Sequence, residues 1–333
     1  MIALGKTRPF APAVLSAALL LAACGSSEDT SDDTATTEDG GSGSSGSISV
    51  ETNHGPVELD EPATTVVALE WSFAENLVAL GIQPAGVADV EGYSQWVSAG
   101  PELGEDVVDV GTRQEPSLDQ IEALEPDLIL TDDDRSVVNI EELQDIAPTY
   151  SSDFYGHEGG QLQAMRDIFQ DTAVLTGTED AADEIMADFD ARMEAFEKAL
   201  DSADAAGEPF LLAQGFTYEG AATVRIFGKP TFASELLEAA GMENGWPGDT
   251  DEYGLTDTDV EGLTQADPAS SLIYVAQEDD NIFTEELADN PIYQGLEFVE
   301  EDRVHPIDPG TWLWGGPVTA ITVYDEVQAA LGL

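Results

Sequence analysis

Arginine side chains at expected loops or strand ends suggest a binding site in this sequence. Arg113, Arg135 and Arg225 occupy such places in a chain that has only 10 lysines and arginines. A guanidinium group binds oxygen anions through paired hydrogen bonds, so these three could together hold a polyanionic ligand. In an acidic protein, each arginine could instead only neutralise neighbouring carboxylates. The residues alone leave both interpretations open.

Two other basic residues belong to an expected long helix. Arg192 and Lys198 each have a carboxylate four residues away, at Asp188 and Glu194. Residues four apart are neighbours on a helix surface, so we expect exposed ion pairs that contribute little stability.

Two tryptophans near the C-terminus are the strongest aromatic signal. Trp312 and Trp314 stand two residues apart in the segment GTWLWGG, residues 310–316, before an expected helix. On an extended segment, side chains two apart share one face. Such a pair could line a concave site for a bulky ligand, with Trp71 and Tyr253 as further candidates. Alternatively, the pair covers the core between a sheet and the last helix.

Catalytic and metal-binding patterns are weak. His54, His157 and His305 lie far apart and lack the spacing of metal ligands. The sequence contains no phosphate-binding glycine loop and no serine in a nucleophile elbow. The acidic run at 132–134 lacks the pattern of a calcium loop, and we expect a solvated loop there. The sequence therefore predicts neither an enzyme nor direct protein–metal bonds.

The composition indicates a globular protein with a strongly acidic surface. The chain has 333 residues, of which 42% are hydrophobic, and this length suits about two domains. Its 68 acidic residues give a formal net charge of −58. Such a charge repels phosphates, which excludes nucleic acid as a partner.

The first residues are typical of an exported lipoprotein. Lys6 and Arg8 precede an apolar run at 11–23, which ends in Leu-Ala-Ala before Cys24. A basic start, a short apolar core and small residues describe a secretory signal, and the run is short for a transmembrane helix. LAACG resembles a bacterial lipobox, which implies cleavage before Cys24 and a lipid on its sulfur. An ordinary secretory signal with an incidental cysteine is the alternative.

The segment after Cys24 cannot form a core. Residues 25–47 contain only Gly, Ser, Thr, Asp, Glu and the single alanine Ala35, so we expect a disordered tether. We predict a signal peptide at 1–23, the lipidated cysteine with an acidic Gly/Ser tether at 24–47, and a folded part from residue 48. Cleavage leaves 8 basic residues against 68 acidic ones, a net charge of −60.

Expected strands and helices alternate through the folded part. In the first half we expect a hairpin at 49–58, strands at 65–69, 86–88, 107–110 and 127–130, and helices at 72–80, 117–124 and 139–146. In the second half we expect strands at 210–213, 223–227, 272–275 and 304–307, and helices at 232–240 and 317–331. This alternation favours an α/β fold with a mostly parallel, doubly wound sheet.

A long amphipathic helix separates the two halves. Apolar residues recur at spacings of 4, 4, 3 and 4 in Ile185, Phe189, Met193, Phe196 and Leu200, which is the period of one helix face. We predict an N-terminal lobe at 48–172, a linking helix at 173–206 and a C-terminal lobe at 207–333.

The segment 110–135 concentrates candidate site residues. Arg113 follows one expected strand and Arg135 follows another. Loops at the carboxyl ends of strands in open α/β sheets line the ligand crevice, so we expect both arginines to face one mouth.

The two halves also echo each other. Asp119 lies in Ser-Leu-Asp-Gln-Ile and Glu261 in Asp-Val-Glu-Gly-Leu, and in both an acid stands two residues before an aliphatic, ahead of an apolar strand. Two similar lobes are the simplest explanation, and chance similarity of generic units is the alternative.

Together these residues resemble the iron–siderophore substrate-binding proteins of ABC importers, particularly the ferric-citrate and ferric-hydroxamate binders. The resemblance runs from residue 48 to the C-terminus and is strongest in VGTR, PSLDQIEALEPDLIL, DR and IAP within 110–148. RIFG, FASELLEAAGMEN and TWLWG extend it into the second half. The resemblance implies two Rossmann-like lobes joined by one long rigid helix, the helical-backbone type of metal and siderophore receptor.

The resemblance also implies residue roles. Arg113 matches the arginine of the family's N-lobe turn, and Arg135 matches an arginine of the ferric-citrate type. The expected ligand-binding set is Arg113, Arg135, Arg225, Tyr253, Trp312, Trp314 and Trp71. Asp119 and Glu261 fall where the family has acids that dock onto the permease.

The implied function is a monomeric, lipid-anchored receptor on the outer face of the cell membrane. It captures a ferric siderophore and delivers it to an ABC permease dimer with its ATPase. The chelator holds the iron, so no cofactor is expected other than the lipid on Cys24. An arginine pocket in so acidic a chain predicts preference for anionic chelates such as ferric citrate, although the aromatic set also suits a hydroxamate. Alternatives are a haem or cobalamin receptor of the same fold, a surface adhesin or an enzyme.

Overall fold

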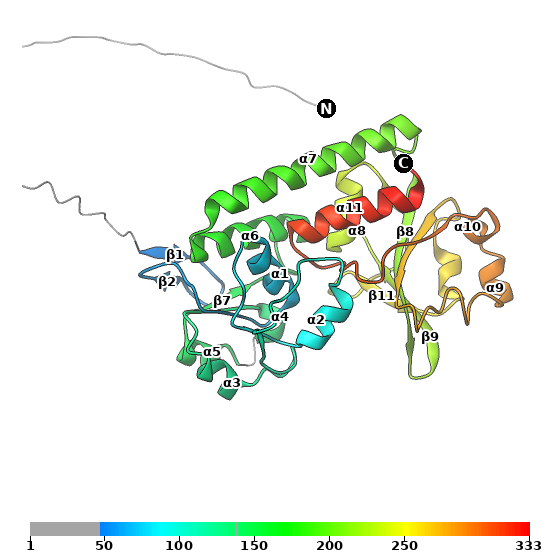
Figure 1. Ribbon diagram of the computed structural model, residues 1–333. Coiled ribbons are helices and arrows are strands. Elements are labelled where there is room, and N and C mark those ends of the chain that lie inside the picture. The colour runs from blue at the N-terminus through cyan, green and yellow to red at the C-terminus, as the bar shows by residue number, and fades with distance from the viewer. Residues whose placement is uncertain (1–46, 137–138) are drawn as a thin grey trace, which may run out of the picture. The chain divides into compact units, whose positions relative to one another are not determined.

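The computed structural model describes residues 47–136 and 139–333 of the chain (Figure 1). The expected signal peptide, Cys24 and all but the last residue of the expected tether lie outside the described residues. Within the described ranges, no helix is both long enough and apolar enough to cross a membrane.

The N-terminal lobe is built on a parallel sheet. Its strand order is β5-β4-β3-β6-β7 and each neighbouring pair is parallel. The strands are β3 (Val66–Ala68), β4 (Gly86–Val87), β5 (Val108–Asp109), β6 (Leu128–Asp132) and β7 (Thr149–Ser152). The central strands β3 and β6 are almost wholly buried, as expected where helices cover both faces of a parallel sheet. The expected hairpin precedes this sheet, as β1 (Ile48–Val50) and β2 (Val57–Leu59).

The sequence predicted some helices of this lobe and missed others. They are α1 (Trp71–Ala79), α2 (Val90–Trp96), α3 (Leu118–Ala123), α4 (Asp133–Ser136), α5 (Ile140–Ile146) and α6 (Gln161–Thr176). The predictions of α1, α3 and α5 are confirmed. The sequence interpretation missed α2, β7 and α6, although α6 buries a regular apolar face.

The prediction of a solvated loop at 132–134 is wrong. These residues end β6 and begin α4. The Asp133 carboxylate is half-buried and accepts hydrogen bonds from His54 Nε2 at 2.8 Å and Ser151 Oγ at 2.5 Å. Partners far away in the sequence therefore turn an acidic run into ordered structure.

The C-terminal lobe contains a mixed sheet rather than a mainly parallel one. Its order is β11-β9-β8-β12-β13, with β10 also paired to β8. The strands are β8 (Pro209–Tyr218), β9 (Ala221–Phe227), β10 (Glu243–Asn244), β11 (Leu255–Thr258), β12 (Ser271–Ala276) and β13 (Val304–Pro306). The pairs β8–β9 and β9–β11 are antiparallel, whereas the others are parallel.

A two-residue turn creates the antiparallel part. Glu219 and Gly220 connect paired residues Tyr218 and Ala221, with φ of +50° and +83°. Positive φ at both central residues is the hairpin turn whose twist matches the flanking strands. The turn lets β8 and β9 run on together beyond the rest of the sheet (Figure 1).

The remaining elements of the C-terminal lobe cover this sheet. They are α8 (Phe232–Ala239), a single 3₁₀ turn η1 (Gly262–Gln265), α9 (Pro291–Gln294), α10 (Glu297–Glu300) and α11 (Pro317–Leu331). The predicted helices α8 and α11 are confirmed within one or two residues.

The long helix α7 (Glu179–Ala203) packs on both lobes (Figure 1). Phe189 and Phe196 belong to the core around α8 and α11, whereas Ala182 packs with Leu80 and Phe169 of the N-terminal lobe. The fold class predicted from sequence, two α/β lobes joined by one long helix, is confirmed.

Arg192 holds α7 to the last helix. Its Nε lies 2.5 Å from Asp325 Oδ1 and its Nη2 donates to Gln328 Oε1 at 3.0 Å, both on α11. The predicted local pairing with Asp188 is therefore wrong, because this face of α7 meets α11. Lys198 does pair with Glu194, at 2.6 Å, as predicted.

Candidate ligand-binding site

A cavity of about 530 Å³ opens between side chains of both lobes. Its N-terminal wall comes from the start of α1, the end of α2 and the turn after β5, and its C-terminal wall from β8, β9 and the loops after β12 and β13. The lining residues are Trp71, Gln95, Trp96, Arg113, Gln214, Gly215, Phe216, Thr217, Arg225, Leu255, Gln277, Asp279, Asp280, Trp312 and Trp314. Of the predicted ligand residues, this cavity brings together Trp71, Arg113, Arg225, Trp312 and Trp314.

Trp71 is fixed where the chain passes from β3 into α1. Its indole Nε1 donates to the carbonyl oxygens of Ala88 and Asp89, each at 3.1 Å. The side chain is only 3% exposed, so packing and hydrogen bonds together lock one ring orientation.

The two C-terminal tryptophans continue this aromatic wall. Trp312 meets Trp71 edge-on with ring centroids 4.9 Å apart, and Trp314 lies 4.8 Å from Trp312. Trp314 also packs on Phe227 of β9 at 4.9 Å. Leu313, between them, is buried in the C-terminal core. The segment thus puts both tryptophans on the cavity side and the intervening leucine in the core.

Arg113 stacks on this wall. Its guanidinium carbon lies 3.7 Å from the centre of the Trp71 ring, and Nη1 donates to Glu70 Oε2 at 3.2 Å. The arginine and glutamate side chains are 16% and 9% exposed. Cation–π attraction and the ion pair are both stronger in such a desolvated place than at the surface.

Arg225 also has a carboxylate partner. It stands opposite Asp257 in the β9–β11 register and binds it through two parallel hydrogen bonds of 2.8 and 3.0 Å. Its guanidinium carbon lies 5.0 Å from the Phe216 ring centre. This pair is more exposed than the first, at 30% and 48%.

Each of the two cavity arginines therefore has its charge compensated by a partner acid. Arg113 and Arg225 each hold an acid, and Asp279 and Asp280 add two carboxylates to the wall. Asp280 accepts hydrogen bonds from the Thr217 backbone N–H at 2.8 Å and the hydroxyl at 2.5 Å. Among the described side chains, the positive pocket expected from the sequence is not found, because the partner acids lie far from the arginines along the chain.

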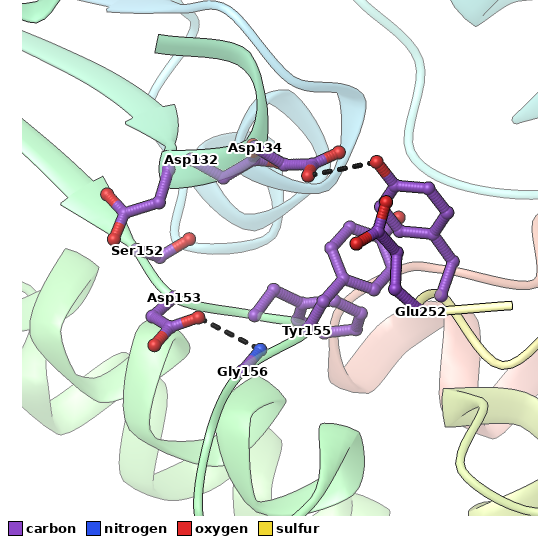
Figure 2. A pocket seen from close by; sticks show the side chains of 10 residues that line it. Asp132, Asp134, Ser152, Asp153, Tyr155, Gly156 and Glu252 are labelled. Atoms are coloured by element: carbon purple, nitrogen blue, oxygen red, sulfur yellow. Dashed lines mark hydrogen bonds between the residues drawn. The ribbon is translucent and has the colours of Figure 1, made fainter. Parts of the chain in front are cut away.

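Tyr253 lies at a different pocket, of about 310 Å³, shown in Figure 2. Its hydroxyl donates to Asp134 Oδ1 at 3.2 Å, and its ring lies 5.0 Å from that of Tyr155. Aspartates of the N-terminal lobe and Glu252 surround this pocket (Figure 2). The backbone of Arg135 belongs to α4, but its side chain lies outside what the structure describes.

The two expected docking acids are both exposed and lie away from the cavity lining. Asp119 is in the first turn of α3, whereas Glu261 directly precedes the 3₁₀ turn η1. The local structures around the two acids differ. The two similar sequence segments therefore hold similar positions without sharing one backbone geometry.

Several cavity residues escaped the sequence interpretation. Phe216 and Thr217 were missed because the expected strand ended at residue 213, which is only the fifth residue of the ten-residue β8. Gln277 directly follows β12, so the strand-end rule could have found it. Its amide donates to Pro309 O at 3.0 Å and thereby holds the chain just before Trp312. Within the described residues, no group of three or more His, Cys, Asp or Glu side chains is arranged to hold a metal ion.

A cavity between two α/β lobes that share one long helix is the arrangement of a solute-binding protein. The family model described as periplasmic binding protein matches residues 66–311, and the chain belongs to this family.

Curated relatives and solved structures agree with this assignment. The chain is 29% identical over 268 residues to the Iron(3+)-hydroxamate-binding protein FhuD of Escherichia coli, which covers 80% of this chain and 86% of the relative. It is 24% identical over 271 residues to the Fe(3+)-citrate-binding protein YfmC of Bacillus subtilis, covering 81% of each. The crystal structure of the Fe3+–Desferal-bound siderophore binding protein FhuD from Vibrio cholerae shares the fold, with a TM-score of 0.68, 24% identity and coverage of 80% of this chain and 97% of that one.

The difference in burial between the two ion pairs leads to a prediction. A double-mutant cycle of Arg113→Met with Glu70→Gln should give a coupling free energy above about 1 kcal/mol. The matched cycle of Arg225→Met with Asp257→Asn, on the more exposed pair, should stay below about 1 kcal/mol. Urea unfolding of the ligand-free protein measures both. Equal couplings would show that burial does not strengthen the Arg113 pair.

Proposed function

We propose that this protein captures a ferric siderophore outside the cytoplasm and delivers it to an ABC permease for iron uptake. Membership of the periplasmic binding protein family supports this, as do relatives named for ferric chelates. The observation that carries the proposal is the cavity at the lobe junction, whose wall combines four tryptophans with a stacked arginine. It is a binding site without an evident reaction, which fits a receptor rather than an enzyme.

The charge balance of the cavity favours a hydroxamate-type ligand. Three hydroxamate groups each carry one negative charge, so their complex with Fe³⁺ is electroneutral. Burial of a neutral, bulky chelate needs no excess of positive side chains, whereas an anion without a counter-charge is costly to desolvate. Aromatic rings can cover the organic part of the chelate, and Arg113 can still donate to its oxygens. Iron in this proposal is cargo that the chelator holds.

Ferric citrate is the second candidate. The similarity to a protein named for ferric citrate favours it. Arg113 and Arg225 could exchange their present carboxylates for those of citrate, because a guanidinium binds either in the same bidentate manner. That exchange would break the ion pair between Arg113 and Glu70, whose side chain is only 9% exposed.

Delivery to the permease gives a role to the exposed acids. Asp119 and Glu261 are placed outside the cavity and so could contact arginines of a permease while the ligand stays bound. One acid on each lobe suits a partner that is itself a dimer. We propose that the receptor acts as a monomer that docks through both lobes onto the permease, which works together with its ATPase.

Tryptophan fluorescence provides the test of ligand class. Four of the chain's 5 tryptophans line the cavity, so a bound ferric chelate should quench most of the emission. We expect a ferric tris-hydroxamate to bind about tenfold more tightly than ferric citrate, with no saturable response to haem or cobalamin. Trp312→Phe should weaken binding severalfold, whereas Trp246→Phe, in the C-terminal core away from the cavity, should not.

Titration of free tryptophan with the same chelates corrects for absorption of light by the ligand. Tighter binding of ferric citrate would refute the charge argument. A lack of response to every ferric chelate would refute the proposed function itself.

Anchoring is the remaining part of the proposal. The LAACG sequence around Cys24 favours a lipid on this residue. Cys24→Ser should therefore move the protein from the membrane fraction to the soluble extracytoplasmic fraction, with unchanged affinity for the chelate. Fractionation of cells followed by immunoblotting measures this. A variant that stays with the membranes would show that the cysteine is not the anchor.

A further inference from the structure

A glutamate of the N-terminal lobe is buried against the start of the last helix of the C-terminal lobe. Glu75 lies one turn after Trp71 on α1 and is only 1% exposed. Its Oε1 accepts from the Thr319 backbone N–H at 2.7 Å. Its Oε2 accepts from the Thr319 hydroxyl at 2.7 Å and from the Gly316 N–H at 3.3 Å. These N–H groups belong to the N-cap residue and the first turn of α11, where a helix leaves its own N–H groups without partners.

Glycines make this close approach possible. A Cβ atom at Gly315 would stand 2.5 Å from Glu75 Oε2, and one at Gly316 would overlap Asn76 Oδ1. No side chain other than hydrogen fits between α1 and this turn. The pair Gly315-Gly316 directly follows Trp314, so the same contact sets where the tryptophan segment ends.

The other end of the tryptophan segment is also held by the N-terminal lobe. The backbone N–H of Ala99 donates to Gly310 O at 3.2 Å. Trp312 and Trp314 therefore lie on a segment of the C-terminal lobe whose two ends are bonded to the other lobe. Between these ends, the two tryptophan rings contact Trp71, Phe227, Arg113 and each other.

Residues four apart share a face of a helix, which couples Glu75 to the aromatic wall. Trp71 contacts Trp312 from the first turn of α1, and Glu75 holds the chain beyond Trp314 from the next turn. One rigid helix thus supplies both a ring of the wall and the anchor of the other rings. The tryptophan rings keep a single orientation only if neighbouring residues hold them in place.

We propose that Glu75 is a positioning residue for ligand binding, which fixes Trp312 and Trp314 against Trp71 by capping α11 from the opposite lobe. The identity of the ligand in this inference rests on the proposed function, whereas the contacts of Glu75 do not depend on it. Burial raises the pKa of Glu75 above its usual value and the three hydrogen bonds oppose that shift. Both carboxyl oxygens of Glu75 accept hydrogen bonds, and a glutamine side chain offers only one such oxygen.

A second glutamate provides a matched control. Glu235, on α8 of the C-terminal lobe, accepts from the Leu162 N–H at 2.7 Å at the start of α6, and a Cβ at Gly160 would stand 2.5 Å from it. Burial raises its pKa as well. Here a carboxylate of the C-terminal lobe binds the start of a helix of the N-terminal lobe, which is the reverse of the Glu75 contact. This second contact lies away from the tryptophan segment.

The test compares Glu75→Gln with Glu235→Gln in the mature protein. Without ligand, Glu75→Gln should lose much of the near-ultraviolet circular dichroism of the tryptophans and shift their emission to longer wavelength, and it should bind a ferric tris-hydroxamate about tenfold more weakly. Glu235→Gln should lower the urea midpoint but keep the wild-type spectrum and bind within about twofold of wild type. A wild-type spectrum and affinity in Glu75→Gln, or equal spectral changes in both variants, would overturn the proposal.

Two further outcomes of this experiment can be told apart. If the wild type binds no ferric chelate, the proposed function fails, and the ligand-free spectra still decide the role of Glu75. If Glu75→Gln does not fold, Gly316→Ala replaces it, because the added methyl group pushes the segment away from Asn76 without removing the carboxylate. Loss of the tryptophan signals in Gly316→Ala supports the positioning role, and a wild-type spectrum contradicts it.

Discussion

A continuous contact of aromatic rings joins the two lobes, and the rest of the site depends on it. It runs from Trp71 of the N-terminal lobe through Trp312 and Trp314 to Phe227 of the C-terminal sheet, with centroids 4.8 to 4.9 Å apart. Rings at this spacing attract one another beyond the effect of burying their area. The cavity wall is therefore built from side chains that also hold the lobes in register, and the long helix α7 adds support on both lobes.

Charge has a secondary place in this arrangement. The chain is extremely acidic, yet its cavity holds arginines that already have carboxylate partners. A guanidinium stacked on Trp71 and bonded to Glu70 is preorganised, since neither its position nor its partner has to change when a ligand enters. Selectivity in such a site comes from shape, aromatic contact and a few directed N–H groups rather than from net attraction. The proposed preference for an electroneutral chelate over a polyanion rests on this arrangement.

Much of the fold could be predicted from local patterns, and the parts that could not have identifiable causes. The apolar period of Phe189, Phe196 and Leu200 predicts α7 because one helix face must be buried. The resemblance carried by the VGTR and TWLWG segments placed Arg113, Trp312 and Trp314 among the candidates, and the structure puts all three at one cavity. The ion-pair partners could not be predicted from the sequence, because Glu70 lies 43 residues before Arg113, and a chain with 68 acids offers many candidates. The Glu75 cap was hidden for the same reason, since its partners lie more than 240 residues away.

The most direct measurement of this account is the dissociation constant for a ferric tris-hydroxamate as a function of ionic strength. If compensated arginines and aromatic packing bind a neutral chelate, the constant should change by less than about threefold between roughly 0.1 and 1 M NaCl, because screening acts on uncompensated exposed charges. Isothermal titration calorimetry gives the value at each salt concentration. A change of about tenfold or more over the same range would mean that net electrostatic attraction or repulsion governs binding, which contradicts binding of a neutral chelate by compensated arginines and aromatic packing.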